Sequence, residues 1–201
     1  MRALAAAAAL AAPAGAEPPA TDPAIGRLNR GGTRVHHCTA ALVAPREALT
    51  ARHCVANVPV EDLHLVLGWE RGTYAEHLRV ASVVASDVAD IARLCLDGPA
   101  RTPPLATDAA PPAAGVVGVT GYPGSRAHLQ DERLCWMEPG SDGAAAVAAL
   151  GCPLEGGFSG GPVRGPGPDG PVIGVAFASS ATGSLAALLG ALPPDADCPA
   201  P

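Results

Sequence analysis

Short apolar runs separated by Gly- and Pro-rich turns constrain the fold of this chain most strongly. Regularly spaced short strands with little helix indicate an all-β barrel or sandwich. One segment differs, because the leucines of 184–192 have helical spacing, so we predict a short C-terminal helix that ends before Pro193. Only 3% of the residues are aromatic, so Val, Leu, Ile and Ala must build the core. The strand-like runs lie at 33–43, 63–69, 77–85, 116–120, 134–137, 144–152 and 172–177.

Residues 1–16 have the features of a secretory signal peptide. Arg2 provides a positive start, and 3–12 form an uncharged apolar run that is too short to span a bilayer as a mature helix. Small residues at 14–16 are suited to cleavage, and the Pro-rich residues 17–24 would follow as a leader. We therefore expect a protein that is secreted or periplasmic after signal-peptide removal and has no membrane partner.

Charge and cysteine content exclude some classes of partner. The net charge is −6, which gives no reason to expect nucleic acid or an anionic membrane as a partner. The six cysteines are an even number without a Cys-x-x-Cys pair, so we expect disulfides in an oxidising compartment rather than a structural zinc site. Six cysteines allow fifteen pairings, which the sequence alone leaves open. The pairings that we consider plausible are Cys38–Cys54, Cys135–Cys152 and Cys95–Cys198.

A serine between glycines, in the segment Gly157-Phe158-Ser159-Gly160-Gly161-Pro162, is the candidate nucleophile. A serine hydroxyl attacks a carbonyl efficiently only when a base takes its proton and N–H donors hold the charge that develops. Glycines allow sharp bends and a close approach to a substrate, so the N–H groups of Gly157 and Ser159 could point at one oxyanion. Without a base and an acid elsewhere, the same residues would form an ordinary turn.

His53 and Asp90 are the candidate base and acid. His53 precedes Cys54, and a disulfide at Cys54 would hold the histidine in place. Asp90 begins the apolar run 90–96, where a buried carboxylate is costly unless it has a partner. A hydrogen bond from Nδ1–H of His53 would provide that partner. Asp87 is the alternative acid, but it lies further from the apolar run.

Three motifs together resemble those of the trypsin/chymotrypsin-type serine proteases. Thr50-Ala51-Arg52-His53-Cys54 is similar to the family's Thr-Ala-Ala-His-Cys, and Asp90-Ile91-Ala92-Arg93-Leu94 is similar to its Asp-Ile-Ala-x-Leu. Gly157-Phe158-Ser159-Gly160-Gly161-Pro162 is similar to its Gly-Asp-Ser-Gly-Gly-Pro. The order His, Asp, Ser along the chain is also the order of this family.

This resemblance implies two antiparallel six-stranded β-barrels with the site in the cleft between them. The trypsin-like domain would cover 25–201, with the N-terminal barrel at about 25–98, a linker at 99–114 and the C-terminal barrel at about 115–192. The family also has a disulfide beside its histidine, which corresponds here to Cys38–Cys54.

The implied activity is that of a secreted serine endopeptidase that hydrolyses peptide bonds through an acyl-enzyme. Ser159 would be the nucleophile, His53 the base and Asp90 the acid that orients it. The N–H groups of Gly157 and Ser159 would form the oxyanion hole. We expect protein or peptide substrates, no cofactor, no metal, and a monomer.

Two departures from the family bear on activation. Phe158 stands where trypsins have the aspartate that pairs with a new N-terminus after zymogen cleavage, so we do not expect activation by that ion pair. Arg52 stands beside His53 in place of a small alanine, and we expect its side chain to point outward. These two departures motivate the alternative function, which is that of a catalytically inactive homologue that acts as a secreted binding protein.

The determinants of specificity also differ. Residues 119–124 and 172–174 are similar to the bacterial glutamyl-endopeptidase (V8-like) branch. However, Ala176 occupies the position of that branch's glutamate-recognising histidine, and Pro153 occupies that of the aspartate that gives trypsins their preference for Lys and Arg. Glu155 lies four residues before the nucleophile, and the sequence does not determine where its side chain points. We expect a pocket for a small or apolar side chain. The residues that we assign to substrate binding are Pro153, Ala176, Phe177, Ala178 and Ser179.

Overall fold

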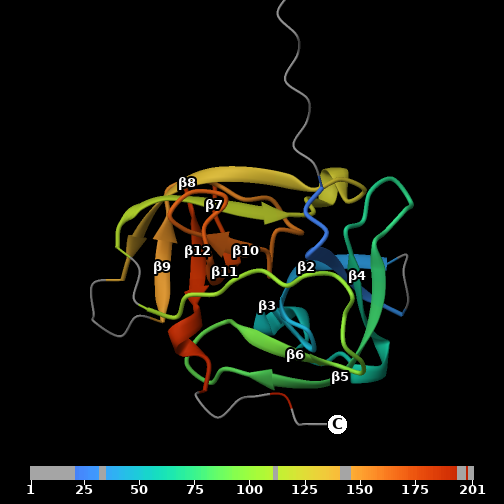
Figure 1. Ribbon diagram of the computed structural model, residues 1–201. Helices are drawn as coiled ribbons and strands as arrows, with labels where there is room; N and C mark the ends of the chain where they lie inside the picture. The colour runs from blue at the N-terminus through green and yellow to red at the C-terminus, as the bar shows by residue number, and fades with distance from the viewer. Residues whose placement is uncertain (1–20, 32–34, 111–112, 141–145, 194–197, 199–201) are drawn as a thin grey trace, which may run out of the picture.

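The computed structural model describes residues 21–31, 35–110, 113–140, 146–193 and 198. Twelve strands in this part of the chain form two closed barrels of six strands, in which all neighbouring strands are antiparallel. Figure 1 shows the first barrel at the lower right and the second at the upper left. The predicted all-β fold of two six-stranded barrels is therefore confirmed.

The strands of each barrel follow one another along the chain. The first barrel consists of β1 (Ile25–Arg30), β2 (Val35–Ala44), β3 (Glu47–Thr50), β4 (Leu63–Leu67), β5 (Glu76–Ala85) and β6 (Ala92–Leu96), in the order β1-β2-β3-β6-β5-β4. The second consists of β7 (Gly115–Gly121), β8 (Asp131–Pro139), β9 (Val147–Leu150), β10 (Pro162–Arg164), β11 (Val172–Ser179) and β12 (Ser184–Leu188), in the order β10-β11-β12-β9-β8-β7. Single 3-10 turns are η1 (Arg52–Cys54), η2 (Val60–Asp62), η3 (Gly124–Arg126) and η4 (Leu189–Ala191).

The predicted signal peptide, 1–16, lies outside the described residues, as does the first half of the predicted leader, 17–24. In the described part of the chain, no helix is both long and apolar enough to cross a membrane.

Alternating aliphatic residues build the core of the first barrel. In β4, Leu63, Leu65 and Leu67 are buried and belong to one hydrophobic cluster. His64 and Val66 lie between them in the strand, and because side chains alternate across a strand they face away from that cluster. The second barrel has its own cluster.

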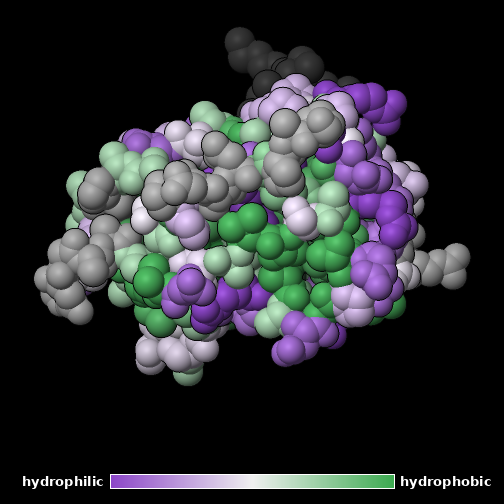
Figure 2. All heavy atoms as spheres, turned by 90° about the horizontal axis from the view of Figure 1, so that it is seen from below, coloured by the Kyte–Doolittle hydropathy of each residue, from purple (hydrophilic) through white to green (hydrophobic). Residues whose placement is uncertain are grey.

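Seen from below, one face of the molecule shows hydrophobic residues near its centre with polar residues around them (Figure 2).

A third cluster joins the two barrels. It contains Leu49 of β3 and Ile91 from the first half of the chain, and Val172, Val175 and Leu189 from the second half. All five are less than a tenth exposed. Apolar packing therefore helps to set how the barrels sit against each other and where the loops between their strands lie.

The segment predicted as a linker, 99–114, is attached to the first barrel through a buried carboxylate. Glu76 of β5 accepts hydrogen bonds from the backbone N–H groups of Arg101 and Thr102 and from the hydroxyl of Thr102. Burial of Glu76 would raise its pKa, but these donors outweigh burial and hold the pKa below its usual value. Further on, Leu105 packs against both the first-barrel cluster and the cluster between the barrels.

The predicted helix over 184–192 is wrong. This segment forms β12 and then a single 3-10 turn, η4. β12 pairs with β9 on one side and with β11 on the other, so it closes the second barrel. Closing the barrel satisfies the backbone groups of both neighbouring strands, and this gain outweighs the local preference of Ala and Leu for helix.

Candidate active site

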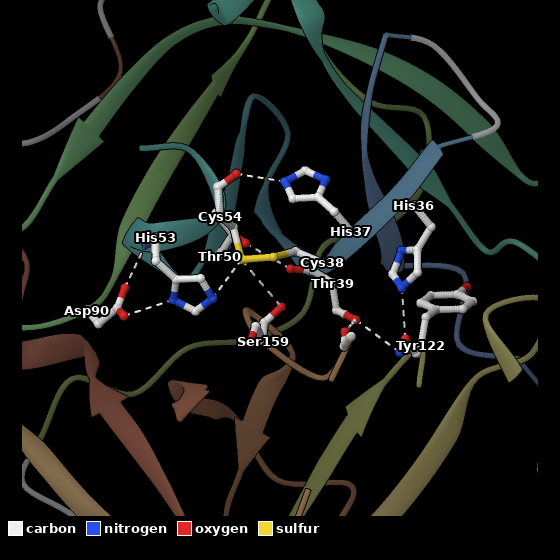
Figure 3. Close-up of a disulfide and its surroundings, with 11 residues drawn as sticks. His36, His37, Cys38, Thr39, Thr50, His53, Cys54, Asp90, Tyr122 and Ser159 are labelled. Carbon is white, nitrogen blue, oxygen red and sulfur yellow. Dashed lines mark hydrogen bonds and ion pairs between the residues drawn. A yellow bond between two sulfur atoms is a disulfide. The ribbon is translucent and has the colours of Figure 1, made fainter. Parts of the chain in front are cut away.

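Three loops meet where the two barrels adjoin. His53 lies in η1, directly after β3; Asp90 lies between β5 and β6; and Ser159 lies between β9 and β10. In Figure 3, Asp90 and His53 lie to the left, the disulfide between Cys38 and Cys54 lies at the centre, and Ser159 lies below it. The three residues proposed from the sequence thus come together from distant parts of the chain.

The carboxylate of Asp90 binds His53 twice. Oδ1 accepts the backbone N–H of His53 at 2.9 Å, and Oδ2 lies 2.8 Å from Nδ1 of the ring. Because an ionised carboxylate only accepts hydrogen bonds, Nδ1 carries the proton and Nε2 is left as a proton acceptor. The side chains are 46% and 21% exposed for His53 and Asp90, so both remain in reach of solvent. Asp87, the alternative acid, is exposed, and Asp90 is the carboxylate that contacts His53.

The loop that carries Asp90 is fixed on both sides of it. Ala89 and Ile91 are 6% and 0% exposed and belong to the cluster between the barrels. The hydroxyl of Ser86 donates to the carbonyl of Ala191 in η4 at 2.6 Å and accepts the N–H of Ala89 at 3.2 Å. The position of the acid therefore depends on packing and hydrogen bonds that cross from one barrel to the other.

The neighbours of His53 are also held in place. The guanidinium of Arg52 donates to the carbonyl of Ser86 at 2.9 Å. This contact directs Arg52 to the loop of the acid. Cys54 forms the disulfide to β2, and its carbonyl accepts a hydrogen bond from Nε2 of His37 at 2.7 Å. Burial lowers the pKa of His37, which keeps its ring neutral.

The loop of Ser159 depends on glycine. Gly157 and Gly160 have φ angles of 101° and 81°, in the left-handed region that other residues rarely adopt. A side chain at Gly157 would also overlap the carbonyl of Tyr122. Among the described residues, the N–H groups of Gly157 and Ser159 have no acceptor. Two neighbouring donors are therefore available to bind an anion at this loop.

Phe158 has an apolar environment. It is 1% exposed and belongs to the core cluster of the second barrel. Its ring lies so close to Gly121 that a side chain at that glycine would overlap it. The position where trypsins carry an aspartate is therefore part of the apolar core in this protein.

His53 and Ser159 contact the same sulfur atom. Nε2 of His53 lies 3.6 Å from Sγ of Cys54, and the carbonyl oxygen of Ser159 lies 3.8 Å from the same atom. A disulfide sulfur carries no proton, so these are packing contacts. Within the described residues, no hydrogen bond joins Nε2 of His53 to the hydroxyl of Ser159. Such bonds are often long in a free enzyme and shorten when substrate binds.

A cavity of about 440 Å³ opens beside the serine. Its lining includes four of the five residues that the sequence assigned to substrate binding. The fifth, Pro153, does not line it and is exposed. The reason is that the N–H of Leu154 donates to the hydroxyls of Ser179 and Ser184, at 3.0 and 2.9 Å, which places Leu154 at the wall. The lining residues are Leu154, Glu155, Gly156, Phe158, Ser159, Ala176, Phe177, Ala178, Ser179 and Ser180.

Glu155 is the charged residue among those that line the cavity. Its carboxylate accepts hydrogen bonds from the backbone N–H and the hydroxyl of Ser125, which lower its pKa. The hydroxyl of Ser179 in the wall pairs at 3.1 Å with that of Ser184 outside the cavity lining, and Ser184 also donates to the carbonyl of Cys152. Apart from the carboxylate of Glu155, which Ser125 binds, the polar side chains that line the cavity are hydroxyls. Sequence reasoning missed Leu154, Gly156 and Ser180 as lining residues, and the place of Leu154 depends on the hydrogen bonds of its N–H to Ser179 and Ser184.

The structure contains the three disulfides put forward from the sequence: Cys38–Cys54, Cys135–Cys152 and Cys95–Cys198. His53 lies within 4.8 Å of the first, in the one group of possible metal ligands found among the described residues. Both sulfurs are consumed by the disulfide, so the group offers no thiolate to a metal.

Comparisons with known proteins agree with this fold. Residues 38–175 match the family model of the trypsin-like peptidase domain. A search of the curated proteins gave no match. Among solved structures, the chain is similar to the VesB protease of Vibrio cholerae, with 16% identity and a TM-score of 0.73 over 84% of this chain and 61% of that one. The chain thus spans less than two thirds of the length of VesB.

Two further structures are similar. The thermostable serine protease AL20, from an extremophilic microorganism, has 17% identity and a TM-score of 0.69 over 85% of this chain and 93% of that one. The human heparin binding protein has 19% identity and a TM-score of 0.70 over 87% of this chain and 89% of that one. At such identities the likeness concerns the fold.

Proposed function

Because the chain belongs to the trypsin-like peptidase family, we propose that it is a serine endopeptidase in which Ser159, His53 and Asp90 act as the catalytic triad. The observation that carries the proposal is the double contact of Asp90 with His53, at 2.9 and 2.8 Å, next to the loop of Ser159. This contact fixes the orientation of the ring and its tautomer, which is what a general base in this position requires.

The proposed reaction has two halves. Nε2 of His53 takes the hydroxyl proton of Ser159 while Oγ attacks the carbonyl carbon of the peptide bond. The oxygen of that carbonyl becomes an oxyanion, which the N–H groups of Gly157 and Ser159 bind. His53 then gives its proton to the leaving amine, the C–N bond breaks, and an acyl-enzyme remains. Water, deprotonated by the same imidazole, hydrolyses the ester and restores Ser159.

A fluorophosphonate probe tests this assignment directly, since it phosphonylates only an activated serine. We expect the wild-type protein to be labelled on Ser159 and to cleave an unfolded protein such as casein. Ser159→Ala should abolish labelling and reduce cleavage by several orders of magnitude, about 10⁴-fold or more, with unchanged circular dichroism. Cleavage by that variant at the wild-type rate would overturn the proposal.

The cavity supports a preference for a small or apolar side chain before the scissile bond. Its wall is formed by Leu154, Ala176 and Phe177 together with paired hydroxyls. The carboxylate of Glu155 is engaged by Ser125. A peptide library with Ala, Val, Leu, Lys and Glu at this position tests the preference, and faster cleavage after Lys or Glu would contradict it. Membership of the V8-like branch stays a prediction.

We also propose that the protein acts outside the cytoplasm, secreted or periplasmic, as a monomer on protein substrates. Three disulfides are typical of oxidising compartments. Fractionation of the producing cells would test the location.

The alternative is an inactive member of the family that serves as a binding protein. One observation favours it: Nε2 of His53 contacts Sγ of Cys54 at 3.6 Å instead of the Ser159 hydroxyl. Under this alternative the wild-type protein would resist the fluorophosphonate probe while remaining folded.

A further inference from the structure

Thr39 connects the first barrel to the loop of the proposed nucleophile. It lies in β2, next to Cys38, and is fully buried. Its backbone N–H donates to the carbonyl of Ser159 at 2.8 Å, and its hydroxyl donates to the carbonyl of Gly157 at 2.7 Å. A single residue of the first barrel thus binds two carbonyls of one loop of the second.

The same two residues carry the donors of the proposed oxyanion hole. Among the described residues, the N–H groups of Gly157 and Ser159 have no acceptor, whereas their carbonyls are held by Thr39. A carbonyl shares one rigid peptide plane with the N–H of the next residue, so the held carbonyls of Gly157 and Ser159 fix the peptide planes that directly follow the N–H groups of these two residues. Holding both carbonyls therefore limits how the two N–H groups can move.

Thr39 is itself held from two directions. Its hydroxyl oxygen accepts the backbone N–H of Tyr122 at 3.0 Å, and its carbonyl accepts the hydroxyl of Thr50 at 2.8 Å. Every hydrogen-bonding group of Thr39 is used, and three of its four partners lie in the second barrel. Figure 3 shows Thr39 between Ser159 and Tyr122.

Tyr122 extends this contact to the other side of the loop. Its carbonyl accepts a hydrogen bond from Nε2 of His36 at 2.9 Å and lies against Gly157, where a side chain would overlap it. Close by, the N–H of Gly124 donates to the carbonyl of Gly156 at 2.7 Å. The loop that carries Gly157 is therefore enclosed between β2 and the residues that follow β7.

We propose that Thr39 is a positioning residue that sets the geometry of the oxyanion hole through the carbonyls of Gly157 and Ser159. The inference rests on the proposed function, since it needs an oxyanion to bind. Its consequence is kinetic. The oxyanion forms only after attack, so the loss of this support should lower kcat and leave substrate binding nearly unchanged.

The test compares a substitution that removes the hydroxyl of Thr39 with one that keeps it. Thr39→Val keeps the shape but removes the hydroxyl, so we expect kcat on a chromogenic peptide amide to fall about 10- to 100-fold, with KM within about twofold. Thr39→Ser keeps the hydroxyl and should retain kcat within about threefold. A peptide boronic acid, which mimics the tetrahedral intermediate, should lose affinity for Thr39→Val in proportion to kcat/KM.

Thr102→Val is the matched control. Thr102 is also a buried threonine of the first half of the chain, and its hydroxyl donates to Glu76 in the linker contact. This variant should lower the thermal midpoint but keep kcat. If Thr39→Val does not fold, the smaller Thr39→Ala replaces it, with activity normalised to folded protein by circular dichroism.

The outcomes separate the two proposals. If the wild type fails to react with the fluorophosphonate, or if Ser159→Ala still cleaves, the proposed function is wrong. If the wild type is active and the folded Thr39→Val or Thr39→Ala keeps its kcat, or changes only KM, the role assigned to Thr39 is refuted. A similar loss of kcat in Thr39→Ser and Thr102→Val would also refute it, because the effect would then be one of stability.

Discussion

His36 should make the protein less stable as the pH falls below neutrality. Its ring is largely buried, its Nε2 donates to the carbonyl of Tyr122 at 2.9 Å, and burial together with the nearby Arg27 lowers its pKa from 6.5 to about 4. In the unfolded chain the same histidine takes up a proton near pH 6.5. Between these two pH values the unfolded state binds more protons, so the free energy of unfolding decreases as the pH falls.

The size of the effect follows from the two pKa values. The pKa of His36 is 6.5 in the unfolded state and about 4 in the folded state. Its titration therefore lowers the free energy of unfolding by about 2 kcal/mol at pH 5 and by about 3 kcal/mol at pH 4. Such a loss is a large part of the stability of an ordinary domain, which is about 5–15 kcal/mol. We therefore expect His36 to contribute strongly to acid sensitivity.

His36→Gln isolates this contribution. The side-chain amide is neutral and can still donate to the carbonyl of Tyr122, but it does not titrate. Urea unfolding with intact disulfides, followed by circular dichroism at pH 7, 6, 5 and 4, gives the free energy of unfolding for both proteins. The wild-type value minus the variant value should fall by about 3 kcal/mol from pH 7 to pH 4. A difference that stays constant to within about 0.5 kcal/mol would refute the reasoning.

Four further substitutions test other parts of the structure. Asp90→Asn should lower kcat on a peptide substrate about 10⁴-fold, because the tautomer of the base would no longer be fixed; a loss below about tenfold would contradict this. Phe158→Asp puts a carboxylate into an apolar core and should lower the free energy of unfolding by about 5 kcal/mol or more, so that no thermal unfolding transition is seen. A variant that unfolds at the same temperature as the wild type would contradict the burial of Phe158 in this core. Gly160→Ala would overlap the Thr39 carbonyl and the Thr50 hydroxyl, so urea unfolding should show a loss of about 2 kcal/mol or more. Glu76→Gln should lower stability by about 1–3 kcal/mol at pH 7, and the difference should shrink in acid, because a carboxyl with a lowered pKa stabilises only while it is ionised; an equal difference at pH 7 and pH 3 would contradict the carboxylate's role.

The sequence was most informative where one residue type performs a defined chemical task. His53, Asp90 and Ser159 could be singled out because a base, a partnered buried acid and a glycine-flanked hydroxyl each leave a local signature. The structure brings the first two into hydrogen-bond distance and the third next to them. The two-barrel fold followed from the family that these motifs resemble, since short strands alone left barrel and sandwich open.

The sequence was least informative where tertiary contacts decide. The leucines of 184–192 have helical spacing, yet barrel closure makes the segment a strand. Pro153 was assigned by counting back from Ser159, but hydrogen bonds of Leu154 to two hydroxyls place that residue at the cavity instead. Thr39 has no signature at all, because a threonine in a strand usually reflects β propensity.

The hydrogen bond between Ser86 and Ala191 has a consequence for biosynthesis. Ser86 belongs to the loop that carries Asp90, and it is hydrogen-bonded to a turn that the ribosome synthesises more than a hundred residues later. A growing or truncated polypeptide that ends before this turn lacks the support for its acid. We therefore expect the geometry of the proposed acid to form only after this turn has been synthesised.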